Sequence, residues 1–239
     1  MLTAPELALL DLKHEVAIAG SAASGGGADA AGGLDQLCLV EVPFVPEVRL
    51  YLARDSTVWW ARMQARSLAL QVPPYWASAW AGGRAVARYV LDNPQTVAGR
   101  RVLDVASGSG LVAIAAGKAG ASAVIANDID PYAVAASVLN ARANAVTVTE
   151  SHADLLDGDG GDAEVILAGD VFYTETLALR MLAFLERAAA RGAQVFVGDP
   201  GRGHLPADRV EIVASYRLPS VDAIVDAQLT HMNVCRPRY

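Results

Sequence analysis

Short β-branched runs alternate with longer amphipathic segments along the chain after Gly99. Runs in this order predict parallel strands joined by helices, because a helix is the usual connection between two parallel strands. The expected strands are 101–105, 122–127, 146–149, 164–168 and 193–197, and the expected helices are 110–119, 131–144 and 174–191. Such an arrangement places helices on both faces of the sheet.

The C-terminal part of the chain departs from this order. Two strand-like runs, 209–218 and 227–235, follow one another without a long helix between them. A pair of this kind is expected to be antiparallel. We therefore predict an α/β fold with a doubly wound, seven-stranded, mostly parallel sheet, in which five parallel strands are closed by a terminal two-stranded unit.

The first 99 residues have a weaker pattern. A modest apolar stripe predicts a helix over 6–18, whereas 19–33 has almost no side chain to bury and indicates a flexible loop. Extended structure is expected over 37–52, and helices over 58–70 and 82–91. The predicted organisation is a flexible arm with a glycine-rich loop (1–36), an accessory segment (37–79) and a main domain (80–239).

Composition narrows the class of protein. A chain of 239 residues with 53% hydrophobic residues can bury one substantial core. Its net charge of −7 repels phosphate backbones and anionic lipid, so neither nucleic acid nor a membrane is expected as a partner. No apolar run reaches the ~18 residues that a membrane-spanning helix needs. The N-terminus has no basic region typical of a signal peptide.

The two cysteines, Cys38 and Cys235, lie far apart and outside any CxxC or Cys/His metal-binding spacing. Neither a disulfide framework nor a metal site is therefore predicted. A reducing cytoplasm is the expected location.

A turn rich in small residues follows the first strand of the main domain. Ser107, Gly108 and Gly110 allow the backbone to turn sharply and to approach a ligand at the start of the next helix. Asp128 ends the second strand, where a carboxylate can accept hydrogen bonds from both ribose hydroxyls. The turn also fits the loose dinucleotide pattern GxGxxA, and a tight connection without a ligand is the alternative interpretation.

Two features favour S-adenosylmethionine over a dinucleotide. Asp104 lies within the first strand, where a buried carboxylate needs a cation or a hydrogen-bond donor, such as an amino-acid ammonium, and would repel a pyrophosphate. In addition, the helix expected over 82–91 precedes this strand, whereas NAD domains more often begin at the strand itself. S-Adenosylmethionine has a ribose and an amino-acid tail but no phosphate.

The residues of this turn resemble a known family. The segments VLDVASGSG at 102–110 and ANDIDP at 126–131 resemble motif I and the following acidic motif of class I S-adenosylmethionine-dependent methyltransferases, which have a Rossmann-like fold. This resemblance covers about residue 80 to the end. The chain departs from the family pattern at Ala106, where a glycine is usual.

A narrower resemblance comes from three further segments, PPYWASAWAGG at 73–83, GDVFY at 169–173 and GDPGR at 198–202. They are similar to the lysine methyltransferases that modify the β subunit of electron transfer flavoprotein, and the likeness covers about 70–202. It implies a protein-lysine N-methyltransferase with S-adenosylmethionine as cofactor and that β subunit as partner.

The predicted site follows from the turn and from this resemblance. The expected cofactor-binding residues are Trp80, Asp104, Ala106, Ser107, Gly108, Gly110, Asp128, Ile129, Asp154, Leu155 and Gly169. A lysine amine, with a pKa of about 10.4, must lose its proton before it attacks. Asp170, at the end of the fourth strand, is expected to orient this amine and help its deprotonation, with Tyr173 as the second catalytic residue. Tyr75, Trp76, Phe172 and Arg202 are expected to contact the substrate.

Several of these residues have structural alternatives. Asp170 could cap the following helix, although Thr174 is better placed for that role. Trp76 and Trp80 stand four apart and would share a face if helical, in which case both could be core residues. Asp154 could be an exposed turn residue.

Other functions remain open at this point. A different protein, such as a ribosomal protein, or a small amine could be the methyl acceptor. A non-catalytic module that binds S-adenosylmethionine and a partner is another possibility, and an NAD-dependent oxidoreductase is the least favoured one. Neither the oligomeric state nor the modified lysine is predicted.

Overall fold

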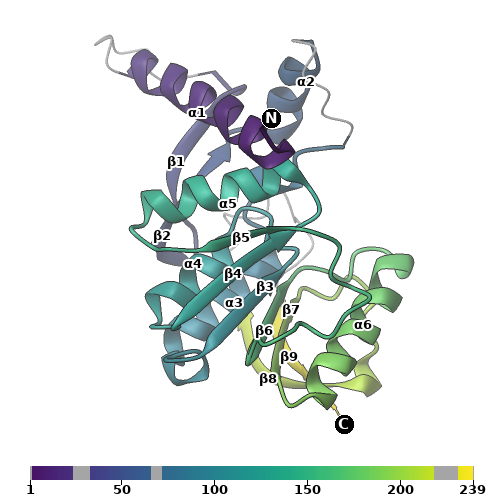
Figure 1. Ribbon diagram of the computed structural model, residues 1–239. Coiled ribbons are helices and arrows are strands. Elements are labelled where there is room, and N and C mark those ends of the chain that lie inside the picture. Colours follow the sequence, from purple (N-terminus) through teal and green to yellow (C-terminus); the bar gives the residue numbers. More distant parts are fainter. Residues whose placement is uncertain (1, 24–32, 66–71, 218–230, 239) are drawn as a thin grey trace.

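A seven-stranded sheet forms the centre of the protein (Figure 1). The computed structural model describes residues 2–23, 33–65, 72–217 and 231–238. The strands of this sheet are β3 (Arg101–Val105), β4 (Ala123–Asp128), β5 (Thr149–His152), β6 (Val165–Gly169), β7 (Gln194–Asp199), β8 (Val210–Arg217) and β9 (His231–Pro237). Their order is β5-β4-β3-β6-β7-β9-β8. Strands β3 to β7 pair in parallel and β9 pairs antiparallel with both β7 and β8, which confirms the predicted doubly wound fold.

Helices cover both faces of this sheet. They are α3 (Ala81–Asp92), α4 (Leu111–Lys118), α5 (Pro131–Ala143) and α6 (Glu175–Ala190). One apolar cluster joins α3 and α4 to the sheet and includes Phe196 of β7. The other joins α6 to the opposite face and includes Phe184. Burial of these two faces, worth roughly 25 cal/mol per Å² of apolar surface, fixes the direction in which each strand end points.

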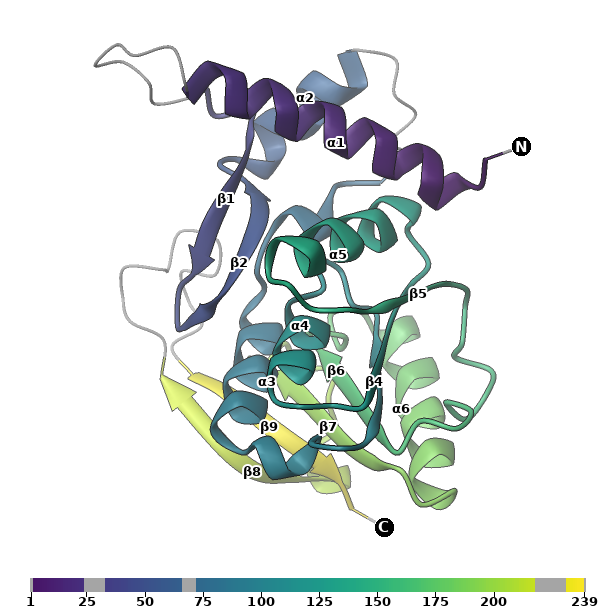
Figure 2. The ribbon, with the colours of Figure 1, turned by 60° about the vertical axis from the view of Figure 1, so that its left-hand side comes forward.

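The N-terminal residues form a separate layer beyond α5. This layer contains α1 (Ala4–Ala23), the antiparallel hairpin of β1 (Leu37–Val42) and β2 (Val45–Ala53), and α2 (Ser56–Ala65). Figures 1 and 2 show α5 lying between α1 and the sheet. Leu12 of α1 and Trp59 of α2 are fully buried against small residues of α5. A hydrogen bond of 2.8 Å from the Tyr132 hydroxyl to Asp11 also ties α1 to α5.

Two elements differ clearly from the sequence prediction, and parts of two others, 66–70 of the expected helix and 227–230 of the expected last strand, lie outside the described residues. The first helix extends from Ala4 to Ala23, so it includes the beginning of the predicted flexible loop, and residues 24–32 lie outside the described residues. The strand expected over 146–149 lies instead at 149–152. Ala145 has a left-handed backbone (φ 55°) and the Val146 N–H bonds to the last turn of α5, so pairing with β4 can begin only three residues later.

Short 3₁₀ turns connect some of these elements. The one that matters for the site is η1 (Tyr75–Ala77), between the N-terminal layer and α3; η2 (Pro94–Thr96) and η3 (Ala207–Arg209) are the others. In the part of the chain that the structure describes, none of the helices has the length and apolar character to cross a membrane.

Candidate active site

The turn after β3 has a strained, tightly packed backbone. Ala106, Gly108 and Gly110 all have positive φ angles, of 55°, 52° and 80°. A Cβ atom at Gly110 would lie 2.8 Å from the Cβ atom of Ser137 in α5, so only glycine fits there. Ala106 adopts the left-handed region with a side chain, at a cost of about 1 kcal/mol. The turn thus reaches the start of α4 by a route that small residues alone permit.

Asp104 holds this turn to α4 from within the core. Its side chain is buried, and Oδ2 accepts a hydrogen bond of 2.9 Å from the backbone N–H of Ala113, in the first turn of α4. Burial raises the pKa of Asp104 to about 8. The partner that the sequence required for this carboxylate is therefore a backbone amide at a helix N-terminus.

Asp128 links the turn to the loop after β4. Its Oδ2 accepts from the Gly108 N–H (2.9 Å) and its Oδ1 from the Asp130 N–H (3.0 Å), and burial raises its pKa. Asp130 itself caps α5 by accepting from the Tyr132 N–H at 2.8 Å. Ile129, between the two acids, exposes 69% of its surface. A carboxylate and an exposed apolar side chain therefore stand together at the carboxyl end of β4.

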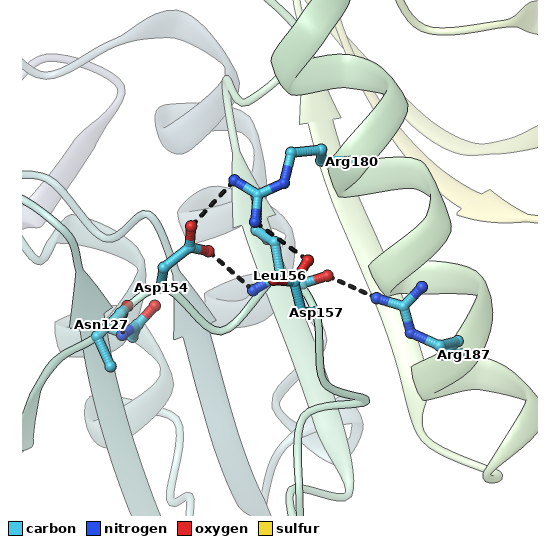
Figure 3. Close-up of polar contacts among 7 residues, drawn as sticks. Asn127, Asp154, Leu156, Asp157, Arg180 and Arg187 are labelled. Atoms are coloured by element: carbon cyan, nitrogen blue, oxygen red, sulfur yellow. Dashed lines mark hydrogen bonds and ion pairs between the residues drawn. The ribbon is translucent and has the colours of Figure 1, made fainter.

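Asp154 lies at the next strand end along this edge, where it is paired with an arginine (Figure 3). Its carboxylate lies 2.9 Å from Nη1 of Arg180 and accepts from the Leu156 N–H at 3.1 Å. Arg180 holds the pKa of Asp154 below its usual range. The neighbouring Leu155 is half-buried beneath α6. Asp154 is thus an exposed turn residue that is ion-paired with Arg180.

Asp170 occupies the carboxyl end of β6 in a left-handed conformation (φ 62°). Its Oδ2 accepts from the Gly82 N–H of α3 at 3.0 Å, and both carboxylate oxygens accept from the guanidinium of Arg202. Only 4% of the Asp170 side chain is exposed. Thr174 caps α6 by accepting from the Leu177 N–H, so Asp170 is not needed as the cap.

Glycines allow α3 to come this close to the sheet. A Cβ atom at Gly82 would lie 2.3 Å from the carbonyl oxygen of Gly198, and one at Gly169 would lie 2.6 Å from the Cα atom of Gly83. The N-terminus of α3 has no capping side chain of its own, because Trp80 occupies the N-cap position. Asp170 instead supplies the acceptor, where a negative charge also interacts favourably with the helix dipole.

Three aromatic rings lie beside this ion pair and form what we call the aromatic rim: Tyr75, Trp80 and Tyr173. The Tyr75 ring centroid lies 6.2 Å from that of Trp80 and 6.5 Å from that of Tyr173. Tyr75 and Tyr173 are 56% and 52% exposed. The Arg202 guanidinium lies 5.6 Å from the Trp80 ring centroid. The rim therefore combines exposed aromatic surface with a carboxylate and a cation.

Trp76 and Phe172 lie elsewhere than the sequence analysis expected. Trp76 is 2% exposed and packs edge-on against Trp59, with ring centroids 5.3 Å apart. Because Trp76 belongs to η1 and Trp80 is the N-cap of α3, the two tryptophans do not share a helix face. Phe172 has no exposed surface and lies in the cluster under α6. Both rings are core residues packed beneath the site, and neither has exposed surface that a substrate could contact in this structure.

Arg202 also differs from expectation. It was expected to contact the substrate, but in this structure it forms an ion pair with Asp170 of the same chain. This pairing is possible because β6 and β7 are adjacent and parallel, which brings the segments that follow them to the same edge.

Comparison with known proteins shows the family of this chain. Residues 89–190 match a family model described as ribosomal protein L11 methyltransferase (PrmA). The electron transfer flavoprotein beta subunit lysine methyltransferase of Rattus norvegicus is 39% identical over 184 residues, which cover 73% of this chain and 70% of that protein. The Homo sapiens protein of the same name is 39% identical over 182 residues, covering 72% and 68%. This chain belongs to the electron transfer flavoprotein beta subunit lysine methyltransferase family.

The protein is therefore an S-adenosylmethionine-dependent methyltransferase. Among solved structures, the ribosomal protein L11 methylase of Lactobacillus delbrueckii subsp. bulgaricus gives a TM-score of 0.46 at 21% identity, covering 64% of this chain and 77% of that one.

The turn of the methyltransferase fits an amino-acid tail and a ribose. The Ser107 hydroxyl is buried and has no hydrogen-bond partner among the described residues, so it can serve a ligand. Apart from its chain neighbours, a Cβ at Gly108 would meet one atom of the described residues within 4 Å, the Cα of Trp76 at 3.9 Å, which leaves the turn open to a ligand. Asp128 lies next to it. These groups match the polar ends of S-adenosylmethionine.

The sequence analysis missed two polar residues of the methyltransferase. Asn127, buried in β4, donates to the carbonyl oxygens of Ser151 and Ala153 and so holds the strand end that leads to Asp154. Asp199, at the end of β7, is 5% exposed. A polar residue inside an apolar strand run was the available signal in both cases.

Proposed function

We propose that this methyltransferase transfers the methyl group of S-adenosylmethionine to the ε-amine of a lysine in the β subunit of electron transfer flavoprotein. One observation carries the proposal: the aromatic rim, with Asp170 held beside it by α3, lies next to the turn after β3. The contact is made by Trp76, the neighbour of Tyr75, because the Cα of Trp76 would lie 3.9 Å from a Cβ at Gly108. The 39% identity to proteins of that name supports the choice of substrate.

The cofactor supplies a methyl group on a positively charged sulfur. On this chain, Asp128 would accept hydrogen bonds from the ribose hydroxyls, and the exposed Ile129 would cover one face of the adenine. Asp154 would accept from the adenine amino group, and Leu155 would pack against the ring. The amino-acid tail and methionine end would lie against Trp80, Asp104, Ala106, Ser107, Gly108, Gly110 and Gly169.

The acceptor amine would lie at Asp170 and the aromatic rim. A lysine is protonated at neutral pH, so the site must first bind an ammonium and then favour its neutral form. The Asp170 carboxylate would orient the amine and help to take up its proton, and the rim would exclude water. Burial raises the pKa of Tyr173, whose neutral hydroxyl can then hydrogen-bond the amine. Holding the amine in line with the methyl group is the main catalytic contribution.

The partner and location follow from the same proposal. The net charge of −7 favours a basic surface on the substrate protein over nucleic acid or a membrane. Cys38 and Cys235 are both free thiols, which suits the reducing cytoplasm that we propose as the location. We also propose that the accessory segment, 37–79, acts as a wall of the site, because the Cα of Trp76 lies against the turn at Gly108.

Intact-mass spectrometry tests this function. Purified electron transfer flavoprotein is incubated with the enzyme and S-adenosylmethionine, and both subunits are weighed. We expect methyl increments on the β subunit alone, their loss with Asp170→Asn, and no loss with Asp208→Asn, a matched change at an exposed position of η3. An unmodified β subunit, while calorimetry shows that the cofactor binds, would refute the substrate assignment.

A further inference from the structure

The guanidinium of Arg202 lies between the Asp170 carboxylate and the Trp80 ring, where an alkylammonium would also be bound favourably. It makes a two-oxygen contact with the Asp170 carboxylate and faces the Trp80 ring at 5.6 Å. A carboxylate together with an aromatic face is the environment that binds organic cations, including lysine side chains. Arg202 comes from the loop after β7, three residues beyond Asp199, whereas Asp170 and Trp80 lie at the ends of β6 and α3. Its side chain therefore reaches in between these two residues from a different segment.

This occupation limits what Asp170 can do. Its Oδ1 accepts from Nε of Arg202, and its Oδ2 accepts from Nη2 of Arg202 and from the Gly82 N–H. An incoming amine therefore finds both oxygens engaged by one cation. Removal of that cation would free Oδ1, whereas the bond to α3 would keep the carboxylate in position.

We propose that Arg202 is a placeholder that occupies the acceptor-lysine position between Asp170 and Trp80, and that it moves to Asp199 when the ammonium of the substrate binds. The inference rests on the proposed function, since it takes an alkylammonium as the ligand. In this proposal Arg202 is a positioning residue, and Asp199 is the carboxylate to which it moves.

Asp199 is ready for such a partner. Its Oδ2 accepts from the Gly201 N–H at 2.7 Å, but its Oδ1 is buried without a hydrogen-bond partner anywhere in the described ranges. A buried acceptor that lacks a donor is costly, by about 1–3 kcal/mol. Arg202 lies close enough to oppose the rise in the pKa of Asp199 that burial and Asp170 cause. Both carboxylates thus act on the same guanidinium.

The backbone around Arg202 permits the movement. Gly201 and Gly203 flank it with φ angles of 89° and 88°, and apart from its chain neighbours a Cβ built at either would meet no atom of the described residues within 4 Å. Two flanking glycines offer little resistance to a local rotation. The change of partner needs only this short segment and the long side chain of Arg202, because Asp199 and Asp170 end adjacent strands.

Calorimetric titration with n-butylammonium chloride tests the proposal without any methyl transfer. The protein is first saturated with S-adenosylhomocysteine. We expect Arg202→Ala to bind the probe about tenfold more tightly than the wild type, because the competing cation is gone. Arg202→Gln, which keeps most of the side-chain volume, should do the same. Adding Asp170→Asn to either variant should abolish the gain.

Equal or weaker binding of the probe by both Arg202 variants, with unchanged melting temperatures, would overturn the proposal. It would mean that Arg202 only supports the fold or the carboxylate. Because n-butylammonium is used, this failure is separate from failure of the proposed function, which is read from methylation of electron transfer flavoprotein.

A double-mutant cycle tests the part assigned to Asp199. We expect Asp199→Asn to weaken binding of n-butylammonium several-fold in the wild type, because the carboxylate that would accept displaced Arg202 is then lost. The same change should have no effect in the Arg202→Ala background, and Asp208→Asn should have none in either. Equal weakening in both backgrounds would contradict the movement of Arg202 to Asp199.

Discussion

Gly82→Ala should disturb the site through the backbone alone. The new Cβ atom would lie 2.3 Å from the Gly198 carbonyl oxygen and 2.6 Å from the Asp170 nitrogen. These two atoms are themselves joined by a hydrogen bond of 2.8 Å, so the methyl group would enter between the ends of β6 and β7. Neither strand end can move away without breaking the ladder. The N-terminus of α3 must therefore shift and lose its bond to the Asp170 carboxylate.

The change in the free energy of unfolding caused by Gly82→Ala is the sum of one favourable and two unfavourable effects. Replacing a helical glycine by alanine gains up to about 1 kcal/mol. Overpacking of a rigid contact costs about 1–3 kcal/mol. Loss of a hydrogen bond to a charged group costs about 1.5–3 kcal/mol. The net loss in the free energy of unfolding is then about 2–4 kcal/mol, which for a protein of this size lowers the melting temperature by about 5–10 °C.

Gly83→Ala is the matched control on the same helix. A Cβ atom there would lie 3.9 Å from a methyl group of Val112 and 4.0 Å from one of Leu111, which are ordinary contacts. This variant should keep or slightly raise the melting temperature, as measured by circular dichroism. Equal melting temperatures of Gly82→Ala and Gly83→Ala would contradict the close packing of Gly82 against the ends of β6 and β7.

Three further changes test residues of the turn after β3 and its neighbour Asp128, one by cofactor binding and two by stability. Asp128→Asn should weaken S-adenosylmethionine binding by about 10- to 100-fold in calorimetry, since a charged hydrogen-bond acceptor is lost; unchanged affinity would exclude Asp128 as the ribose acid. Burial raises the pKa of Asp104 to about 8 in the folded protein, so the unfolded chain ionises first and stability falls as pH rises from about 4 to 8. Asp104→Asn should flatten that decline in melting temperature, and an unaltered profile would contradict the burial argument. Ala106→Gly should raise the free energy of unfolding by up to about 1 kcal/mol by relieving a left-handed alanine; urea denaturation would show no gain if that backbone were unstrained.

The sequence was most informative where local pattern and tertiary structure agree. Runs of β-branched residues followed by small-residue helices gave β3, α4, β4 and α5 to within a residue or two. Consecutive residues of β3, α4 and α5 are buried, so the runs of apolar and small residues that predict these elements lie in the core. The glycine turn was also predictable, because positive φ angles at Gly108 and Gly110 are a local requirement.

Long-range contacts decided the elements that were less predictable. The first helix has only a weak apolar stripe, yet it forms because it packs on α5, where Leu12 is buried and Asp11 accepts a hydrogen bond from Tyr132. The start of β5 depends on a left-handed Ala145, which its sequence does not signal. The bounds of these two elements depend on contacts that are made only in the folded chain.

The same limit applies to the site. Sequence placed Asp170 and Arg202 at one edge of the sheet, because both follow strands that end there. It could not tell that the two side chains pair with each other, since this depends on the left-handed backbone of Asp170 and the reach of a loop. Burial of Trp76 depends likewise on Trp59 of α2, which belongs to another element.

Residue-level mass spectrometry with methyl-deuterated S-adenosylmethionine tests the central claim most directly. Electron transfer flavoprotein is labelled by the enzyme, digested and sequenced by fragmentation. The account predicts deuterated methyl groups on the ε-nitrogen of lysine in the β subunit, with none after labelling by Asp170→Asn. Label on arginine, on an α-amine or on the α subunit would contradict it.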